Sequence, residues 1–278
     1  MDKSILIDSI NSIFLSSKYN FIPEDRALSD DLISAKIFDA PITGIASANS
    51  PMFQELKSEH VIGSHFMLPS EWLPEAKSVI SFFFPLTEVI RAGNRLDKSY
   101  PSKGWMHGRI EGQYFLNKFS SSVISLLNDA GYNAVAPSTD KRFRSSTGIE
   151  TRDLDTMYTS NWSERHIGYV CGMGTFSLSK GLITEKGMSG RMASIITDLE
   201  LPTDKNTFQK YDENCIICGK CIDNCPVNAI SFEHGKNHEL CSKFLDSVLS
   251  ENSPWYGCGK CQVLVPCEYT NPRKNKIS

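Results

Sequence analysis

The sequence predicts a mixed α/β fold that ends in a small cysteine-rich module. A strand-like segment at residues 78–84, rich in Val, Ile and Phe, is followed by a helical stripe at 112–130 and a short apolar run at 132–136. The order strand, helix, strand is typical of helices that cover a sheet. Eight of the nine cysteines lie between residues 215 and 267. This concentration predicts a metal-binding module at that end of the chain.

Composition places the chain among soluble globular proteins. Its 278 residues are 40% hydrophobic and 22% charged, with a net charge of −3, so nothing in the overall balance indicates a nucleic-acid or membrane surface. The first residues lack a basic segment followed by an apolar one, and no apolar run approaches the roughly 18 residues of a membrane helix. We therefore expect a cytoplasmic protein with no membrane partner, whose cysteines ligate metal rather than form disulfides.

The N-terminal half contains alternating helical and strand-like patterns. Apolar residues at helical spacing predict a helix over residues 2–18. Small or β-branched apolar residues predict strands at 40–48 and 78–84. The stretch between them, 51–72, is expected to be helical or irregular. Residues 91–108 combine glycines, a proline and mixed charge, and they are expected to form a functional or mobile loop.

The middle of the chain contains the clearest helix. Residues 112–130 carry one apolar stripe, and Gly131 is a natural C-terminal stop. A short strand is expected at 132–136, a further helix at 160–170 and a strand at 192–199. These elements complete the predicted α/β layer.

Four cysteines between Cys215 and Pro226 follow the spacing C-x2-C-x2-C-x3-C-P. This run is typical of [4Fe-4S] binding, because three thiolates two residues apart can converge on one cubane while Gly219 lets the backbone turn closely. In two-cluster ferredoxins the cysteine before proline, here Cys225, ligates the other cluster. The run itself therefore predicts a second set of cysteines.

The remaining cysteines supply that set, which gives two [4Fe-4S] clusters in all. We assign the first cluster to Cys215, Cys218, Cys221 and Cys267. The second is assigned to Cys225, Cys241, Cys258 and Cys261. The x5 gap before Cys267 differs from the x3 gap of the first run, so the partition between clusters stays open. Zinc is the alternative ligand, although structural zinc sites use paired C-x2-C knuckles. We place the domain boundary between 1–202 and 203–278.

The segment 164–201 contains Glu-Arg-His-Ile-Gly-Tyr-Val-Cys-Gly-Met-Gly-Thr-Phe, and later Gly-Arg-Met-Ala-Ser-Ile-Ile-Thr-Asp-Leu. With the cysteine module that follows, it resembles epoxyqueuosine reductase and, more distantly, the reductive dehalogenases. Those families join a nitroreductase-like, cobalamin-binding α/β domain to a bacterial-ferredoxin-like module with two clusters. The resemblance covers residues 150–270 well, and the preceding residues only in the order of their elements.

The resemblance implies a base-off cobalamin between the substrate and the nearer cluster, reduced through both clusters to a nucleophilic Co(I) state. The cofactor-binding residues that it implies are Gly172, Met173, Gly174, Thr175, Ser177 and Arg191. The glycines would allow close approach of a large ring, and Thr175 and Ser177 would hydrogen-bond its edge. Alternatively, Gly172 and Gly174 form a tight helix-to-strand turn that requires a positive φ.

The resemblance also implies a proton donor, Asp or Tyr, a few residues before the Glu-Arg pair. Counting back gives Tyr158 as the catalytic residue, and Arg152 or Arg165 would lower its pKa. The alternative is a packed aromatic ring, and Asp153 and Asp155 are competing acids. Tyr158 departs from the Asp of the epoxyqueuosine reductases, so a different substrate is expected.

Two further residues are candidates for contact with ligand. Cys171 is interpreted as a buried small hydrophobe or a residue of the cofactor pocket, and His107, in the predicted loop, as a contact to substrate or cofactor.

The leading functional hypothesis is an oxidoreductase that passes electrons from a donor such as ferredoxin or flavodoxin to a small organic substrate. tRNA is a less favoured partner, because family members that act on tRNA often carry further C-terminal helical repeats. The alternatives are an electron-transfer protein and a protein that reduces or handles a corrinoid for a client enzyme.

Overall fold

The fold is built on a four-stranded antiparallel sheet in the order β1-β2-β8-β3. The computed structural model describes residues 1–146 and 158–274. The sheet strands are β1 (Ile42–Ser47), β2 (Ser78–Pro85), β8 (Gly190–Thr197) and β3 (Ala134–Val135). Every residue of β2 is buried, because β2 lies between β1 and β8 and both of its faces are covered. This explains its unbroken apolar sequence.

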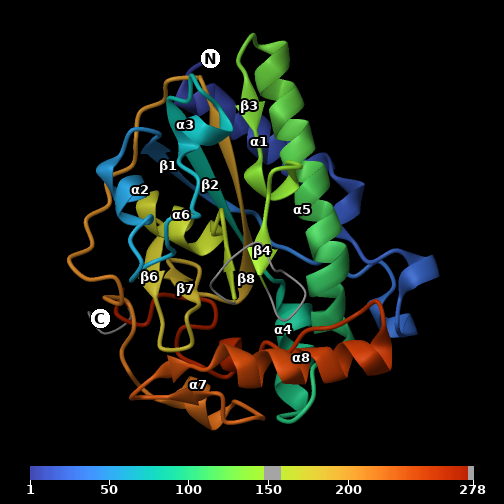
Figure 1. Cartoon of the computed structure of the whole chain (residues 1–278). Helices are drawn as coiled ribbons and strands as arrows, with labels where there is room; N and C mark the ends of the chain where they lie inside the picture. Colours follow the sequence, from blue (N-terminus) through green and yellow to red (C-terminus); the bar gives the residue numbers. More distant parts are fainter. Residues whose placement is uncertain (147–157, 275–278) are drawn as a thin grey trace.

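Helices cover both faces of the sheet (Figure 1). On one face, α1 (Lys3–Ser16) and α5 (Lys103–Asp129) pack against Phe82 and Phe84 of β2. On the other face, α2 (Pro51–Glu55), α3 (Pro69–Trp72) and α6 (Glu164–Val170) enclose a second core that contains Phe83. Alternate residues of one strand therefore belong to different cores, as the two-residue period of a strand requires.

The remaining elements are shorter or lie near the C-terminal module. The helices are α4 (Glu88–Leu96), α7 (Lys220–Asp223) and α8 (His238–Asn252). The two-stranded pairs are β4 (Ser145–Ser146) with β5 (Thr159–Ser160), β6 (Gly174–Phe176) with β7 (Leu182–Thr184), and β9 (Ile230–Ser231) with β10 (Gly235–Lys236). Single 3-10 turns are Lys18–Asn20, Glu24–Arg26, Asp30–Leu32, Pro137–Thr139 and Lys260–Gln262.

The predicted helices and strands are confirmed, but the predicted loop at 91–108 is right only for residues 97–102. Residues 91–96 lie in the second half of α4, and residues 103–108 lie in the first turns of α5. The glycines that suggested a loop instead allow close packing. A Cβ at Gly108 would lie 2.9 Å from Leu86 Cδ2, and one at Gly112 would lie 2.8 Å from Phe38 Cζ. Local propensity was outweighed by the close approach of α5 to the sheet.

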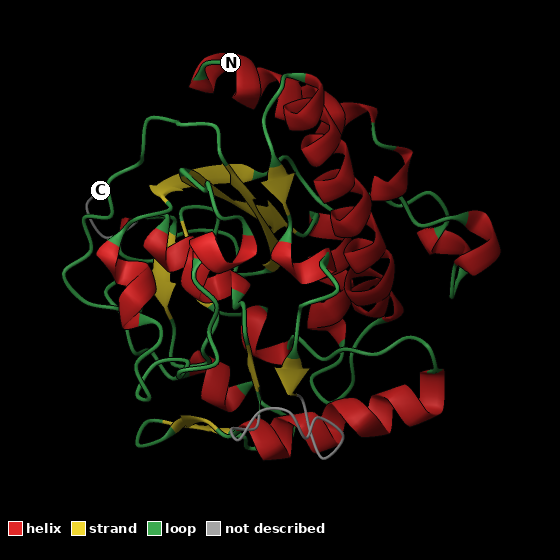
Figure 2. Cartoon of the chain, turned by 45° about the horizontal axis from the view of Figure 1, so that its top comes forward, coloured by secondary structure: helices red, strands yellow, loops and turns green. Residues whose placement is uncertain are grey.

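The C-terminal module lies beneath the sheet, where α8 crosses below α5 (Figures 1 and 2). The module contacts the N-terminal end of α5. The Trp105 ring covers Gly257 and Gly259, and a Cβ at Gly259 would lie 1.9 Å from Trp105 Cε2. Val263 joins the core under α5. Packing therefore crosses the predicted boundary at 202 and 203, and that division of the chain stays a prediction.

Candidate iron–sulfur and cofactor site

Two identical tetrapeptides, Cys-Gly-Lys-Cys, form the two central turns of the module. Gly219 has φ +74° and caps α7, and Gly259 has φ +65° and caps the 3-10 turn Lys260–Gln262. A left-handed residue before a helical turn is the conformation for which glycine has little steric cost. The close turn expected at Gly219 is therefore present, and it occurs a second time in the chain.

The cysteines assigned to the first cluster lie together. Cys215, Cys221 and Cys267 are buried in a small apolar cluster with Ile183 and Val265. Burial raises the pKa of Cys267 to about 12, and the other three thiols of the set add to this effect. Cys218 is exposed at the surface. This set therefore has one edge open to solvent.

The cysteines assigned to the second cluster line one cavity of about 360 Å³: Cys225, Cys241, Cys258 and Cys261. Burial raises the pKa of Cys258 to about 12, and the other three thiols raise it further. Within residues 1–146 and 158–274, no group of three or more His, Cys, Asp or Glu side chains is arranged to hold a single metal ion.

The α/β domain supplies the opposite wall of this cavity. Trp105 and Arg109 come from one face of α5, Arg165 from α6 and Arg191 from β8. Tyr256, from the segment after α8, completes this wall. Trp105 and Arg109 are four residues apart on the helix and so share a face. Sequence reasoning missed both because it placed the start of α5 too late.

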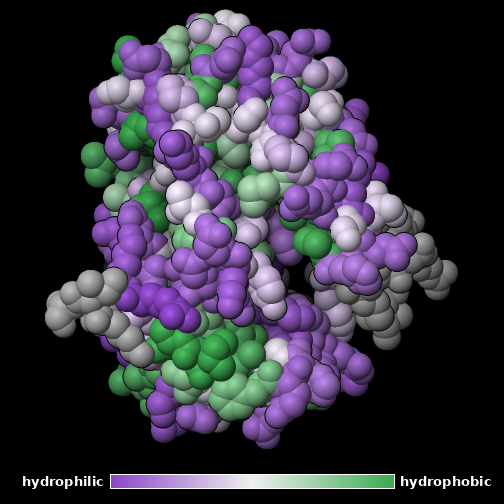
Figure 3. Space-filling view, turned by 90° about the vertical axis from the view of Figure 1, so that its left-hand side faces the viewer, coloured by the Kyte–Doolittle hydropathy of each residue, from purple (hydrophilic) through white to green (hydrophobic). Residues whose placement is uncertain are grey.

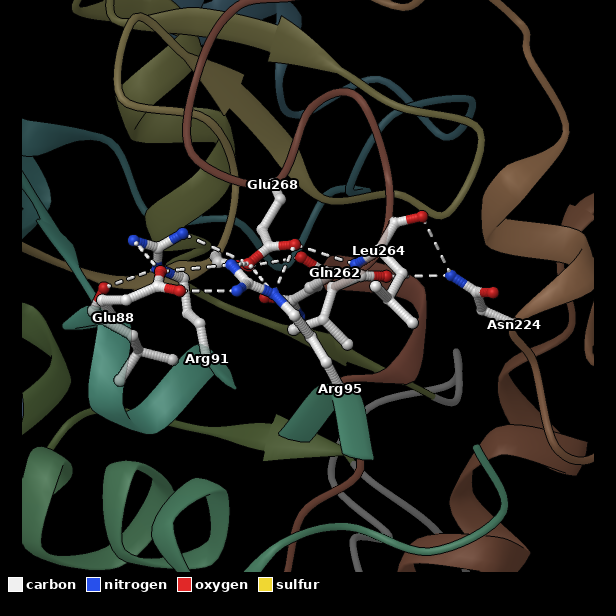
Figure 4. A network of polar contacts seen from close by, with 10 residues as sticks. Glu88, Arg91, Arg95, Asn224, Gln262, Leu264 and Glu268 are labelled. Atoms are coloured by element: carbon white, nitrogen blue, oxygen red, sulfur yellow. Dashed lines mark hydrogen bonds and ion pairs between the residues drawn. The ribbon is translucent and has the colours of Figure 1, made fainter. Parts of the chain in front are cut away.

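A network of charged side chains connects α4 to the segment that follows Cys267 (Figure 4). The Glu268 carboxylate accepts hydrogen bonds from Arg91 Nη1 at 3.2 Å, Arg95 Nε at 3.0 Å and the Leu264 backbone N–H at 2.8 Å. Its side chain is 4% exposed, whereas Glu88, which pairs with the same two arginines, is 61% exposed. Glu268 therefore fixes the chain next to Cys267.

The lysines of the two tetrapeptides lie in different surroundings. Lys260 is buried, and its Nζ donates to the Asn94 carbonyl oxygen at 2.8 Å and to the Asp97 carbonyl oxygen at 2.5 Å. Lys220 is 58% exposed and pairs only with Asp223, at 3.3 Å. Lys260 thus satisfies carbonyls at the C-terminal end of α4 and attaches the second tetrapeptide to that helix.

Of the six predicted cofactor-binding residues, Arg191 alone lines the cavity. Gly172, with φ +72°, ends the turn after α6, and a Cβ there would lie 3.1 Å from the Lys205 carbonyl oxygen. Gly174 lies in β6, and its Cβ would lie 2.1 Å from the Ile183 carbonyl oxygen. The alternative interpretation, a tight turn with a positive φ, therefore accounts for Gly172, whereas Gly174 is explained by its close approach to β7.

The other three predicted residues make contacts with other protein groups. Met173 packs in the second core. Thr175 Oγ1 accepts a hydrogen bond from the Asn214 backbone N–H at 2.7 Å, and Ser177 Oγ lies 2.9 Å from Ser179 Oγ. Contact of these residues with a cofactor stays a prediction.

Tyr158 lies beside the first residue of α8. It has φ +60°, and its ring stacks on His238 with 5.6 Å between centroids. Arg152 and the competing acids, Asp153 and Asp155, lie outside the described residues. The role of Tyr158 as proton donor stays a prediction.

The two other candidate residues are buried away from the cavity. His107 is fully buried in α5, where Nε2 accepts from the Leu28 backbone N–H at 3.0 Å and Nδ1 lies 2.7 Å from Glu111 Oε2. Its placement in a loop was wrong. Cys171 is a buried thiol with Sγ 3.6 Å from the Val79 carbonyl oxygen.

The fold and the cysteine sets define a class: a mixed α/β domain followed by an iron–sulfur module. Residues 208–231 match a family model described as a 4Fe-4S binding domain. A tetrachloroethene reductive dehalogenase from Desulfitobacterium hafniense is 44% identical over 63 residues, which make up 22% of this chain and 11% of the dehalogenase. An epoxyqueuosine reductase from Bacillus anthracis is 29% identical over 118 residues, 39% of this chain and 30% of that enzyme.

Solved structures show the same fold. An epoxyqueuosine reductase crystallised with an epoxyqueuosine-modified tRNA-Tyr stem loop has a TM-score of 0.53 at 16% identity, covering 96% of this chain and 65% of that chain. A reductive dehalogenase whose structure suggests a mechanism for B12-dependent dehalogenation has a TM-score of 0.55 at 16% identity, covering 85% of this chain and 32% of that one. The chain is therefore similar in sequence, over part of its length, and in fold to epoxyqueuosine reductases and reductive dehalogenases.

The named relatives are reductases, which is consistent with an oxidoreductase. The sequence matches span only 11% and 30% of the lengths of the two relatives named above. No helix in the described part of the chain has the length and apolar character to span a bilayer.

Proposed function

We propose that this chain is a cytoplasmic iron–sulfur reductase that uses two [4Fe-4S] clusters and a corrinoid to reduce a small organic substrate. The observation that carries the proposal is the shared cavity. Four cysteines of the second set form one side of it and the α/β domain forms the other. A cluster bound by those cysteines would therefore lie beside any ligand of the α/β domain. The division of the chain into domains at 1–202 and 203–278 is part of the same proposal.

The cysteine sets would serve different purposes because their exposure differs. [4Fe-4S] clusters supply one-electron chemistry whose potential depends on solvent exposure and hydrogen bonding. The first set would be the entry point, since Cys218 is exposed. Large apolar side chains near it are also exposed: Ile217 (48%), Phe232 (57%) and Leu264 (45%). Figure 3 shows a hydrophobic patch on the lower part of the face where α7 lies. We propose that a ferredoxin or flavodoxin docks there.

The cavity walls suit a flat ring. Trp105, Phe244 and Tyr256 provide aromatic surface, and several glycine backbones lie between them. A volume of about 360 Å³ is near the lower end of ligand pockets, so the described cavity accounts for part of a corrinoid. A bound corrinoid would supply the redox chemistry of its cobalt. The protein would orient the ring with these aromatic residues, exclude water, and hold a proton on Tyr158.

Anaerobic reconstitution with iron and sulfide, followed by a titration with cob(II)alamin monitored by EPR, tests this proposal. We expect about eight irons per chain, four for each cluster, and a base-off cobalt signal that saturates at one equivalent. Cys218→Ser and Cys225→Ser should each lose the signal of one cluster. Cys171→Ala is the matched control, since Cys171 is buried in the α/β core and should leave the iron content unchanged.

An electron-transfer protein is the second candidate. The exposed Cys218 and the apolar side chains around it favour it, because such an edge suits transfer between proteins. Full iron content without any change in the cob(II)alamin spectrum would support this candidate and exclude the corrinoid reductase.

A further inference from the structure

The cavity between the second cysteine set and the α/β domain is lined by cations that have no anionic partner. Arg109, Arg165, Arg191 and Lys236 line it, and no aspartate or glutamate does so among the described residues. None of the three arginines forms an ion pair with a described residue, whereas the buried Arg91 is paired with Glu268. Arg109 and Arg191 are half-buried and Arg165 is exposed. Like charges that share a cavity without a counterion repel one another.

The three guanidinium groups retain donors that protein groups do not use. Arg191 donates to Gln113 Oε1 at 2.5 Å, but its buried Nε has no hydrogen-bond partner in the described residues. Arg109 Nη2 donates to the Tyr256 hydroxyl at 2.5 Å, and its guanidinium lies 4.8 Å from the centre of that ring. Arg165 is also directed into the cavity, and no hydrogen bond holds it within the described chain.

The electrostatics agree with this geometry. Burial, with a smaller effect of the charge of Arg109, lowers the pKa of Arg191 to about 9. A buried donor that is left unsatisfied destabilises the folded protein. An anion placed among these groups would satisfy Arg191 Nε and relieve the repulsion between the guanidiniums.

A cluster on the four cysteines would not balance these charges. Its four thiolates are partly neutralised by the iron of the core, so the loaded cluster carries fewer negative charges than the four cations of the lining. Positive charge therefore remains in the cavity after the cluster is bound.

We propose that this cavity binds a small organic oxyanion, a carboxylate or a phosphate, between Arg109, Arg165 and Arg191. The inference rests on the proposed function for the position of the second cluster, and it deepens that function by naming the class of ligand. Bidentate hydrogen bonds from guanidinium to carboxylate or phosphate give both affinity and orientation. The aromatic rings of Trp105 and Tyr256 would contact the organic part of the ligand.

Isothermal titration calorimetry of the iron-loaded full chain, at low salt and without corrinoid, tests the proposal with benzoate and inorganic phosphate. We expect Arg191→Gln and Arg165→Gln each to weaken binding at least tenfold. Arg191→Lys, which keeps the charge but loses the planar donor pair, should give a smaller loss. Lys186→Gln removes one positive charge from an exposed turn outside the cavity and should change the affinity less than twofold. Iron content and far-UV circular dichroism establish that each variant is folded.

Repeating the titration with corrinoids identifies the source of the anion. Displacement of benzoate by cobalamin, but not by cobinamide, which lacks the nucleotide phosphate, would identify the oxyanion as that of the cofactor. Binding of benzoate in the presence of cobalamin would assign it to the substrate.

Wild-type protein that binds neither benzoate nor phosphate, or variants with unchanged affinity, would overturn the proposal. Arginine-dependent binding of benzoate without a base-off cobalt signal would retain the oxyanion site and remove the corrinoid reductase. A base-off cobalt signal without anion binding would retain the corrinoid reductase and remove the oxyanion site.

Discussion

Replacing Glu268 by alanine should destabilise the protein far more than replacing Glu88, although both carboxylates bind the same two arginines. Glu268 is 4% exposed and accepts from Arg91, Arg95 and the Leu264 N–H, at 3.2, 3.0 and 2.8 Å. Removing one partner of a buried ion pair costs about 3–5 kcal/mol. Arg95 is 24% exposed and keeps Glu88 as a partner. We therefore expect a loss of stability at the lower end of this range, about 3 kcal/mol.

Thermal unfolding of the iron-loaded protein, followed by far-UV circular dichroism, measures this difference. At roughly 2–4 °C per kcal/mol for a chain of this size class, Glu268→Ala should lower the midpoint by about 6–12 °C. Glu88→Ala should lower it by a few degrees at most, since exposed pairs contribute about 0–1 kcal/mol. Iron bound by the first cysteine set should also fall in Glu268→Ala, because Glu268 follows Cys267 directly. Equal shifts in the two variants would refute the reasoning.

Three further predictions concern single side chains. Lys260→Ala should cost about 2 kcal/mol of stability, because it removes charged hydrogen bonds from a buried lysine, and Lys220→Ala should cost under about 1 kcal/mol; equal midpoints in thermal unfolding would contradict this. Burial lowers the pKa of His166 from 6.5 to about 4. As the pH falls from 6.5 to about 4, His166 is protonated in the unfolded chain but not in the folded one, so stability falls over this range. Burial raises the pKa of Glu164 from 4.5 to about 7, with the Ser194 and Ser138 hydroxyls opposing it, so stability falls as pH rises between these values. In a plot of unfolding free energy against pH, His166→Gln should therefore remove a rising slope and Glu164→Gln a falling slope. Variant curves that both run parallel to the wild-type curve would exclude both assignments. Tyr158→Phe should abolish substrate turnover but leave cobalt reduction intact, and loss of cobalt reduction would remove the proton-donor assignment.

The sequence allowed the sheet and the cysteine module to be predicted because both depend on local patterns. The unbroken apolar run at β2 and the spacing of the first four cysteines each reflect a short-range requirement. The start of α5 could not be predicted in this way. Its glycines are explained only by Leu86 and Phe38, which lie far from them in the sequence.

The candidate site shows the same limit. Three cysteines of the first set share one apolar cluster and the four of the second set line the cavity, while the partition between two clusters stays a prediction. The arginines of the cavity were less accessible to sequence reasoning. Arg109, Arg165 and Arg191 come from α5, α6 and β8, and no periodicity within one element predicts that they meet. Gly172 and Gly174 were predicted to contact the cofactor, but close approach of backbone atoms explains why glycine occupies both positions.

The two copies of the Cys-Gly-Lys-Cys tetrapeptide share a backbone conformation but differ in how deeply their lysines are buried. Both copies place a left-handed glycine before a helical turn, α7 in the first and a 3-10 turn in the second. They do not encode depth, since Lys220 is in solvent while Lys260 is enclosed by the end of α4 and its loop is covered by Trp105. A designer who transplanted only this tetrapeptide would reproduce a turn. To reproduce an interior site, the receiving protein would also need an aromatic cover and a helix end to receive the lysine.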